Sequence, residues 1–377
     1  MNSFATSDTV KLEGLLTQLK LEEEGKEDFI VPSNRLRLYT PHDVSILRLD
    51  NSAQKDLRPE GLEHANRVDY DSFEHGGALA VNDLAHDHLA KNLGIPKAFY
   101  SRLQSDHPDL LDHNVNRLFR EDVTRKGQSA KRLIRTINGT ARAVLSERYH
   151  IMDHIQILDA IMPVLREVPD MRIQAAKSTD RRLYLKAVFP RVEGEVSKGD
   201  VVQSGIIISN SEVGGGSTMV RRVLFRLVCE NGLIQEATMR KNHISRPSEA
   251  DADYRILSNE TIQAKDKAFL LELKDTVRAV ANDTESFHET LRVMREANAE
   301  VLDNEPEQLV ERIQKRGKLT DKEKNNILGR YLAEGERTRW GAVNAVTAAA
   351  QDQDYDRQVS MEKLGGDMLN RKAFSLN

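Results

Sequence analysis

The sequence predicts an α+β protein: an antiparallel sheet with a hairpin and a packed helix in the middle of the chain, followed by an all-helical C-terminal region. Strand-like segments between residues 131 and 229 are joined by hairpin-length connections, which favour antiparallel over parallel pairing. Beyond about residue 258 the apolar residues recur at helical spacing instead. The order of elements therefore separates a β-rich core from a helical region.

Composition and charge indicate the domain organisation. Of the 377 residues, 39% are hydrophobic and 30% are charged, so the chain can bury a core. Residues 1–115 carry a net charge of −8, residues 116–246 one of +9 and residues 247–377 one of −5. We expect these bounds for a helical or irregular N-terminal region, a basic β-rich core domain and a helical C-terminal region. A basic centre indicates a nucleic-acid partner, or a domain that docks on its own acidic flanks.

Two protein classes are not expected. The N-terminus has no basic region followed by an apolar stretch, and no window approaches the ~20 apolar residues of a membrane span. The single cysteine, Cys229, excludes an internal disulfide framework and a thiolate-rich metal site. We therefore expect a cytoplasmic protein with no membrane contact.

The first third predicts short elements. Leucines recur at helical spacing over residues 9–24, and alternating apolar positions predict an extended chain over residues 29–49. Residues 80–105 predict one or two helices broken at Gly94–Pro96.

The middle third begins with a hairpin. Asn138-Gly139 lies between two apolar runs and is the strongest short hairpin signal in the sequence. A helix follows from Asp153, its expected N-cap, to about residue 168, and Pro163 predicts a kink in it. Further strands are predicted over residues 171–175, 182–189, 201–209 and 218–229, with turns at Gly214–Gly216 and Asn231-Gly232.

The last third predicts helices. Apolar stripes at helical spacing continue from residue 258, over residues 285–299 and over residues 305–316. Thr320 and Glu323 form the pattern of a capping box, which predicts another helix start.

Basic side chains on the hairpin and the later strands are the candidate nucleic-acid contacts. Arginine is always charged and binds phosphate through two hydrogen bonds, and tyrosine can stack on bases. Alternation places Arg182, Tyr184 and Lys186 on one strand face. An ordinary solvated sheet face would carry similar residues. The candidates are Lys131, Arg132, Arg135, Arg142, Arg148, Tyr184, Lys186, Arg222 and Arg226.

Enzyme-like patterns have plainer interpretations. His150 and His154 would share one helix face and could bind zinc beside Asp153, but histidines at a helix start commonly face solvent. A lone cysteine that closes an apolar strand is typically a small buried residue, although a thiol-protease set could be drawn from Cys229, Asn231 and His243. We expect no catalytic residue, metal or cofactor.

Two motifs resemble those of a family of phage- and plasmid-like proteins that carry a domain of unknown function. RLVCENGL, residues 226–233, is similar to the family's Arg-x-Val-Cys-x-Asn-x-Leu signature. RTRWGAVNAVTAAAQD, residues 337–352, resembles its Trp-Gly-x-x-Asn-Ala-Val-Thr segment, although Ala348–Ala350 stand where an acidic residue usually follows. The resemblance covers about residues 130–377 and implies a mobile-element origin.

Together, these features lead to the hypothesis of a phage or plasmid protein that binds single-stranded DNA or RNA. Its expected role is strand annealing in recombination or replication, as a homo-oligomer similar in architecture to Rad52-like annealing proteins. Annealing requires a basic groove and no catalytic side chain. The alternatives are a phage factor that binds and inhibits a host defence or recombination complex, and a metal-dependent hydrolase.

Overall fold

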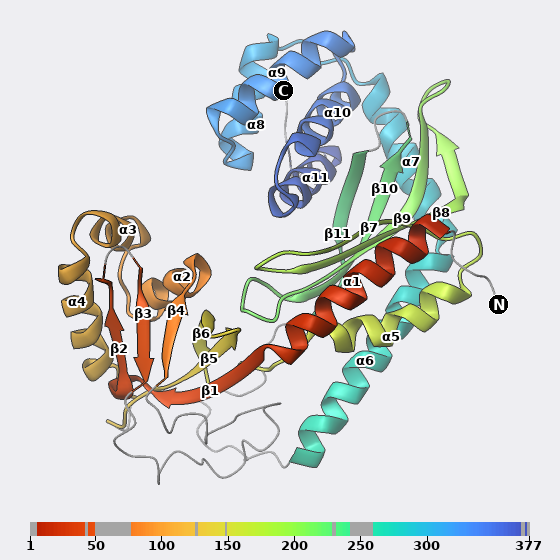
Figure 1. The fold of residues 1–377 in the computed structure, drawn as a ribbon. Coiled ribbons are helices and arrows are strands. Elements are labelled where there is room, and N and C mark those ends of the chain that lie inside the picture. The colour runs from red at the N-terminus through yellow and green to blue at the C-terminus, as the bar shows by residue number, and fades with distance from the viewer. Residues whose placement is uncertain are drawn as a thin grey trace.

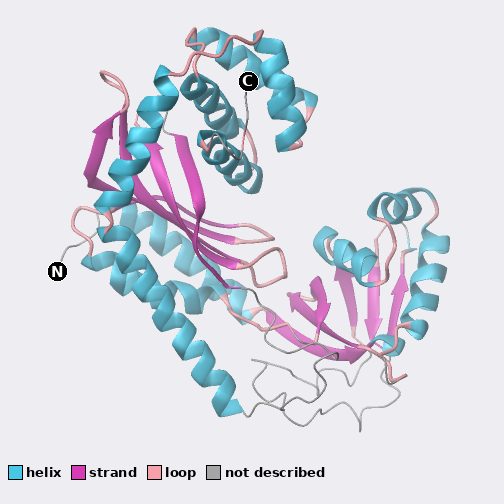
Figure 2. Ribbon diagram, turned by 180° about the vertical axis from the view of Figure 1, so that it is seen from behind, coloured by secondary structure: helices cyan, strands magenta, loops and turns pink. Residues whose placement is uncertain are grey.

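The computed structural model describes residues 6–41, 44–49, 77–124, 127–147, 149–227, 231–241, 259–370 and 374. These residues form two separate sheets with helices packed against each, as Figure 1 and, from behind, Figure 2 show. The predicted α+β class is therefore confirmed, including the helical C-terminal region. Within the described ranges, no helix is long and apolar enough to cross a membrane.

The first lobe is a six-stranded sheet in the order β1-β5-β6-β4-β3-β2, with three helices on one face. Neighbouring strands are antiparallel except β4 and β6, which are parallel. The strands are β1 (Lys26–Pro32), β2 (Leu36–Tyr39), β3 (Ile46–Leu49), β4 (Ala78–Val81), β5 (Lys131–Ile137) and β6 (Thr140–Ser146). The helices are α2 (Asp83–Asn92), α3 (Lys97–Asp106) and α4 (Pro108–Glu121).

The second lobe is an antiparallel meander in the order β11-β10-β9-β8-β7. Its strands are β7 (Arg172–Ser178), β8 (Leu183–Glu195), β9 (Val201–Asn210), β10 (Thr218–Arg226) and β11 (Asn231–Lys241). One face packs on α1 (Thr6–Glu24), α5 (His154–Glu167) and α6 (Asn259–Asn282). The other face meets the C-terminal helices α7 (Thr284–Ala299), α10 (Arg339–Ala349) and α11 (Tyr355–Leu369). α9 (Asp321–Glu334) packs on α10, and α8 (Pro306–Gly317) packs on α9.

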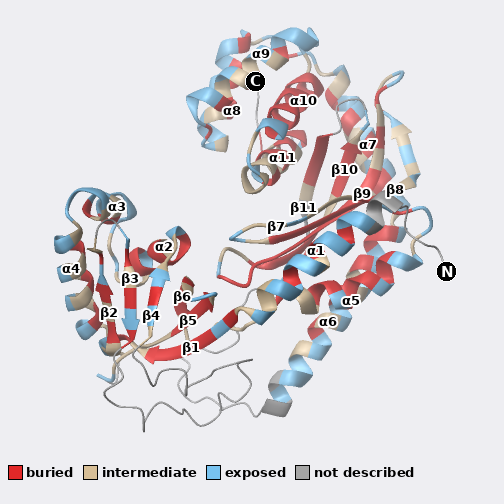
Figure 3. Cartoon of the chain, viewed as in Figure 1, coloured by how far each residue is buried: buried red, intermediate tan, exposed pale blue. Residues whose placement is uncertain are grey.

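Two apolar cores hold the second lobe together, one on each face of its sheet. On one side Ile206 of β9 packs with Leu158 of α5 and Leu273 of α6. On the other side α10 is buried along its whole length, and Figure 3 shows it red almost throughout. Because every residue of α10 is buried, other elements must enclose it, and α7, α9 and α11 surround α10.

The predicted hairpin forms, with positive φ at both Asn138 and Gly139. It belongs to the first lobe, however, because β5 pairs with β1 and β6 with β4. The first third of the chain, expected to be helical or irregular, thus supplies four strands of this sheet. Lys26 pairs with Ile137 across the β1–β5 ladder, and local periodicity carries no information about partners so distant in sequence.

Helix starts follow the predicted capping residues. Asp153 stands at the N-cap of α5, and its backbone N–H donates to Oε1 of Gln156 at 3.1 Å. The capping box of Thr320 and Glu323 is present at the start of α9. The predicted turn at Asn231-Gly232 is wrong: these residues open β11, because Asn231 pairs with Arg226 of β10.

Candidate functional site

Acidic residues of the chain itself neutralise many of the predicted nucleic-acid contacts. Each of four cationic side chains forms an ion pair: Arg132 with Asp122, Lys186 with Glu362, Arg222 with Asp283 and Arg226 with Asp200. Lys131 is half-buried, and Arg148 lies outside the described residues. The structure therefore does not gather the nine candidates into one exposed groove.

Tyr184 and Lys186 share a strand face, as the alternation predicts, and this face lies under α11. Tyr184 is 3% exposed, and its hydroxyl donates to Asp356 at 2.6 Å. Its ring centroid lies 5.3 Å from that of Tyr355. Lys186 Nζ lies 2.7 Å from Glu362. In this arrangement the Tyr184 ring is not available to stack on a base.

Arg135 and Arg142 lie in a buried group of charged residues between the two lobes. We call it the junction cluster; it consists of Lys26, Asp28, Arg135, Arg142, Asp153, His154 and Glu212. Arg135 of β5 is 1% exposed and lies 2.8 Å from Asp153, just before α5, and 3.0 Å from Asp28 of β1. These contacts tie the first sheet to the second lobe.

Glu212, in the loop between β9 and β10, is the acceptor at the centre of the junction cluster. Its side chain is fully buried and accepts hydrogen bonds from Lys26 Nζ at 2.8 Å and Arg142 Nη2 at 2.7 Å. The backbone N–H of His154, in the first turn of α5, donates to the same carboxylate at 2.7 Å. Burial alone would raise the pKa of Glu212, but the surrounding positive groups outweigh it and lower this pKa well below its usual value.

His154 is a neutral member of the junction cluster. Burial lowers its pKa from 6.5 to about 4, with the positive charges of Lys26 and Arg142 acting in the same direction. Nδ1 of the ring lies 3.0 Å from the amide nitrogen of Asn210, which can donate to it only if the ring is neutral. The contact of 3.7 Å between His154 and Glu212 is therefore not an ion pair at neutral pH.

The proposed pair of zinc ligands does not share a helix face. α5 begins at His154, whereas His150 precedes the helix and lies 2.6 Å from Asp266 of α6. Across the described ranges, no group of three or more histidine, cysteine, aspartate or glutamate residues could hold a metal ion. Cys229 and His243 of the alternative thiol set lie outside the described residues.

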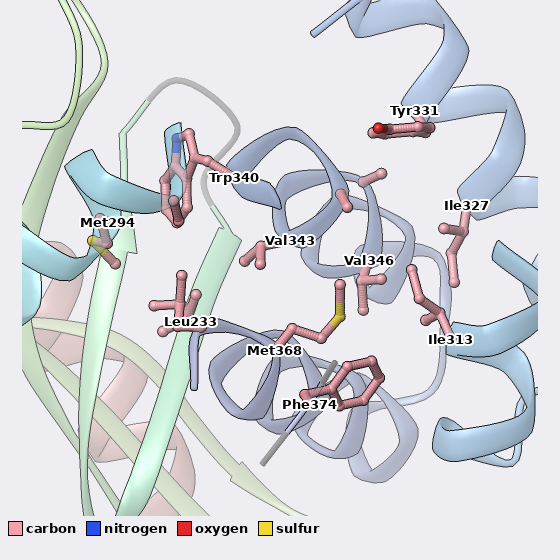
Figure 4. Close-up of a cluster of buried hydrophobic side chains, with 14 of the residues drawn as sticks. Leu233, Met294, Ile313, Ile327, Tyr331, Trp340, Val343, Val346, Met368 and Phe374 are labelled. Carbon is pink, nitrogen blue, oxygen red and sulfur yellow. The ribbon is translucent and has the colours of Figure 1, made fainter. Parts of the chain in front are cut away.

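The two sequence motifs meet at a small cavity between β11 and α10. Asn231 Nδ2 donates to the Thr347 hydroxyl at 2.5 Å, and Trp340 Nε1 donates at 2.8 Å to Asp200, the partner of Arg226. Figure 4 shows Trp340 beside Leu233 and Met294, both of which also line the cavity. Its volume of about 10 Å³ suits a single water molecule. The cavity is too small for an organic ligand.

A different group of cations has no carboxylate partner among the described residues. We call Arg182, Arg221 and Arg240 the arginine cluster; within the described ranges no ion pair joins any of them to an acidic side chain. Arg182 donates through Nε to the carbonyl of Gly215 at 2.9 Å, and Arg240 donates to Ser217. Both of these acceptors belong to the loop between β9 and β10.

Arg221 of β10 is the central member of the arginine cluster. Its Nη2 contacts the sulfur of Met219 at 2.9 Å, and its Nε is buried with no hydrogen-bond partner among the described residues. Burial lowers the pKa of Arg221, and so do the charges of Arg182 and Arg240. Asp367 acts in the opposite direction, but its carboxylate is paired with Lys363 at 2.6 Å. The cluster therefore concentrates positive charge that no carboxylate of the described residues balances.

The sequence did not single out several of these residues. Lys26 and Glu212 are 186 positions apart, so neither residue marks the other in the sequence. Arg182 and Arg221 lie in the predicted strands, but only the register of β8, β9, β10 and β11 joins them to Arg240. The one local signal is Arg221, an arginine on an alternating strand with no acidic residue beside it in the sequence.

The comparison with protein families concerns mainly the second lobe. The model of a family described as Domain of unknown function (DUF932) matches residues 141–370. The chain belongs to this family. No curated protein and no solved structure matches the chain. The DUF932 match includes the arginine cluster, both motifs and the Glu212 side of the junction cluster, whereas Lys26, Asp28 and Arg135 precede it.

Proposed function

We propose that the protein binds single-stranded DNA without catalysing a reaction, as an oligomeric annealing protein of a phage or plasmid would. The observation that carries this proposal is the arginine cluster. Like charges held together without a counter-ion repel one another, and a bound anion would remove this repulsion. Arginine recognises phosphate oxygens through paired hydrogen bonds. The backbone of a nucleic acid is a regular series of such anions.

Two further features support this proposal. The arginine cluster adjoins the loop between β9 and β10, and a backbone carbonyl and a hydroxyl of this loop accept hydrogen bonds from Arg182 and Arg240. Along the chain, the order of hairpin, helix and antiparallel meander is the one we expect of Rad52-like annealing proteins; this is an analogy of element order, since the hairpin and the meander lie in different sheets. Annealing needs bound strands with free bases, so an arginine site for phosphates suits it.

The test is a titration of a fluorescently labelled single-stranded oligonucleotide, followed by anisotropy at low salt beside a duplex control. We expect tighter binding of the single strand. The double variant Arg221→Ala/Arg240→Ala should bind at least about tenfold more weakly, because a charge-assisted hydrogen bond contributes about 1.5 kcal/mol or more.

The matched control for this variant is Arg292→Ala/Arg330→Ala, which removes the same charge from arginines that are ion-paired on α7 and α9. It should bind like the wild type. An equal loss in both double variants would mean that net charge alone governs binding. Absence of wild-type binding at low salt would contradict the proposal and favour a protein partner.

A further inference from the structure

The sheet of the first lobe has one face that the helices do not cover. Along β2, β3 and β4 the residues alternate, and their leucines face α2, α3 and α4 in a buried core. The opposite side chains form what we call the open face: Arg37, Tyr39, Ile46, Arg48, Ala78 and Ala80. Tyr39 is 49% exposed, and Arg48, Ala78 and Ala80 are exposed as well.

Among the described residues, the charges of the open face are unbalanced. Arg37 pairs directly with Arg48 across the β2–β3 ladder, a placement of like charges that destabilises a sheet. The three strands contain no acidic residue. In the described part of the chain no ion pair involves either arginine. The open face therefore suits an anionic partner.

The open face also carries an exposed aromatic ring beside a cation. The guanidinium carbon of Arg48 lies 5.2 Å from the centre of the Tyr39 ring, a stacked arrangement of cation and aromatic. Ala78 is paired with Arg48, and Ala80 with Ile46. Within the described residues, β4 presents only these two methyl groups beside the stack. A planar base can lie there, in contact with the ring and close to both arginines.

We propose that the open face stacks the unpaired bases of single-stranded nucleic acid. This inference rests on the proposed function, because it assigns a second contact region for the same ligand. Tyr39 supplies a stacking surface, and Arg37 and Arg48 bind the adjacent phosphates. A duplex keeps its bases inside the helix and cannot use this surface, so the open face selects single strands.

The experiment compares two oligonucleotides of equal length, one of thymidines and one of abasic sites, which carries the same phosphates without bases. Tyr39→Ala should weaken binding of the thymidine strand about tenfold, since stacking on one aromatic side chain accounts for an effect of this size. Its binding of the abasic strand should be unchanged. Tyr39→Phe keeps the ring and should bind both strands like the wild type.

Phe99→Ala is the matched control, because Phe99 of α3 is equally exposed at 49% but lies in a helix on the other side of the same sheet. It should change neither affinity. Wild-type affinity of Tyr39→Ala for thymidines would overturn the inference, and so would an equal loss on the abasic strand. If Arg221→Ala/Arg240→Ala still weakens binding in those cases, the proposed function stands without the open face. Failure of the wild type to bind either strand would overturn both.

Discussion

Arg135 shows how much a single side chain depends on residues far away in sequence. A cation on a strand beside a turn is compatible with a phosphate contact and with an internal ion pair. The structure buries this guanidinium between Asp28 and Asp153. Burial alone would lower the pKa of Arg135, but the nearby carboxylates outweigh it and raise this pKa. Its positive charge is therefore permanent and internal.

We predict that Arg135→Ala lowers the free energy of unfolding by about 3–5 kcal/mol, because it leaves two buried carboxylates without their partner. Urea denaturation of the purified variant measures this. Lys131→Ala, on the same strand and without an ion pair in the described structure, should stay within about 0.5 kcal/mol of the wild type. A stable Arg135→Ala protein with weakened DNA binding would instead support the surface groove expected from the sequence.

At the scale of elements, the hairpin of β5 and β6 is the clearest case of a prediction from local sequence. Asn138 has φ of 48° and Gly139 of 73°, the left-handed region that a tight two-residue turn requires. The turn sets the register that brings Arg135 and Arg142 to the junction cluster. Its partners β1 and β4 are fixed by tertiary packing, which the turn sequence does not encode.

The same substitution should have opposite effects at two glycines. Gly139→Ala places a Cβ in the left-handed region and should destabilise the protein by about 1 kcal/mol. Gly14→Ala, on the exposed side of α1 where nothing lies within 4 Å of the added Cβ, should stabilise it by up to about 1 kcal/mol. Thermal unfolding of both variants shows whether each one is more or less stable than the wild type. A change in the same direction in both would contradict this account.

At the scale of the whole molecule, the junction cluster joins a DUF932 domain to a sheet that lies mostly before it in sequence. The sequence alone predicted the α+β class, the hairpin and most helix starts, because caps, turns and periodicity are local signals. It did not predict the two-lobed division of the strands, and it left open whether the chain's own acidic residues neutralise the basic centre, as they do at Arg132, Lys186, Arg222 and Arg226. Those features arise from pairings between distant residues.

Buried neutral histidines predict that acid destabilises the protein. Burial lowers the pKa values of His86, His88 and His154 from 6.5 to about 4. As the pH falls, these histidines take up protons in the unfolded chain before they do so in the folded protein. Their contribution to the free energy of unfolding is therefore fully present above pH 6.5 and is lost as the pH drops toward 4. For His154 alone, the free energy of unfolding at pH 5 is lower by about 2 kcal/mol than at neutral pH.

Urea denaturation at pH 7.5 and pH 5 tests this prediction. The free energy of unfolding should be lower at pH 5. In His154→Gln, whose amide can still accept a hydrogen bond from Asn210, the difference between the two pH values should be smaller than in the wild type. Equal stability at both pH values would show that these histidines are protonated in the folded protein.

The salt dependence of single-strand binding tests the central claim most directly. A plot of log affinity against log salt has a slope of about −0.7 for each phosphate neutralised on a single strand. We predict that Arg221→Ala/Arg240→Ala makes this slope shallower by about 1.4, whereas Arg292→Ala/Arg330→Ala leaves it unchanged. Identical slopes for the wild type and the Arg221→Ala/Arg240→Ala variant would contradict a phosphate site at the arginine cluster.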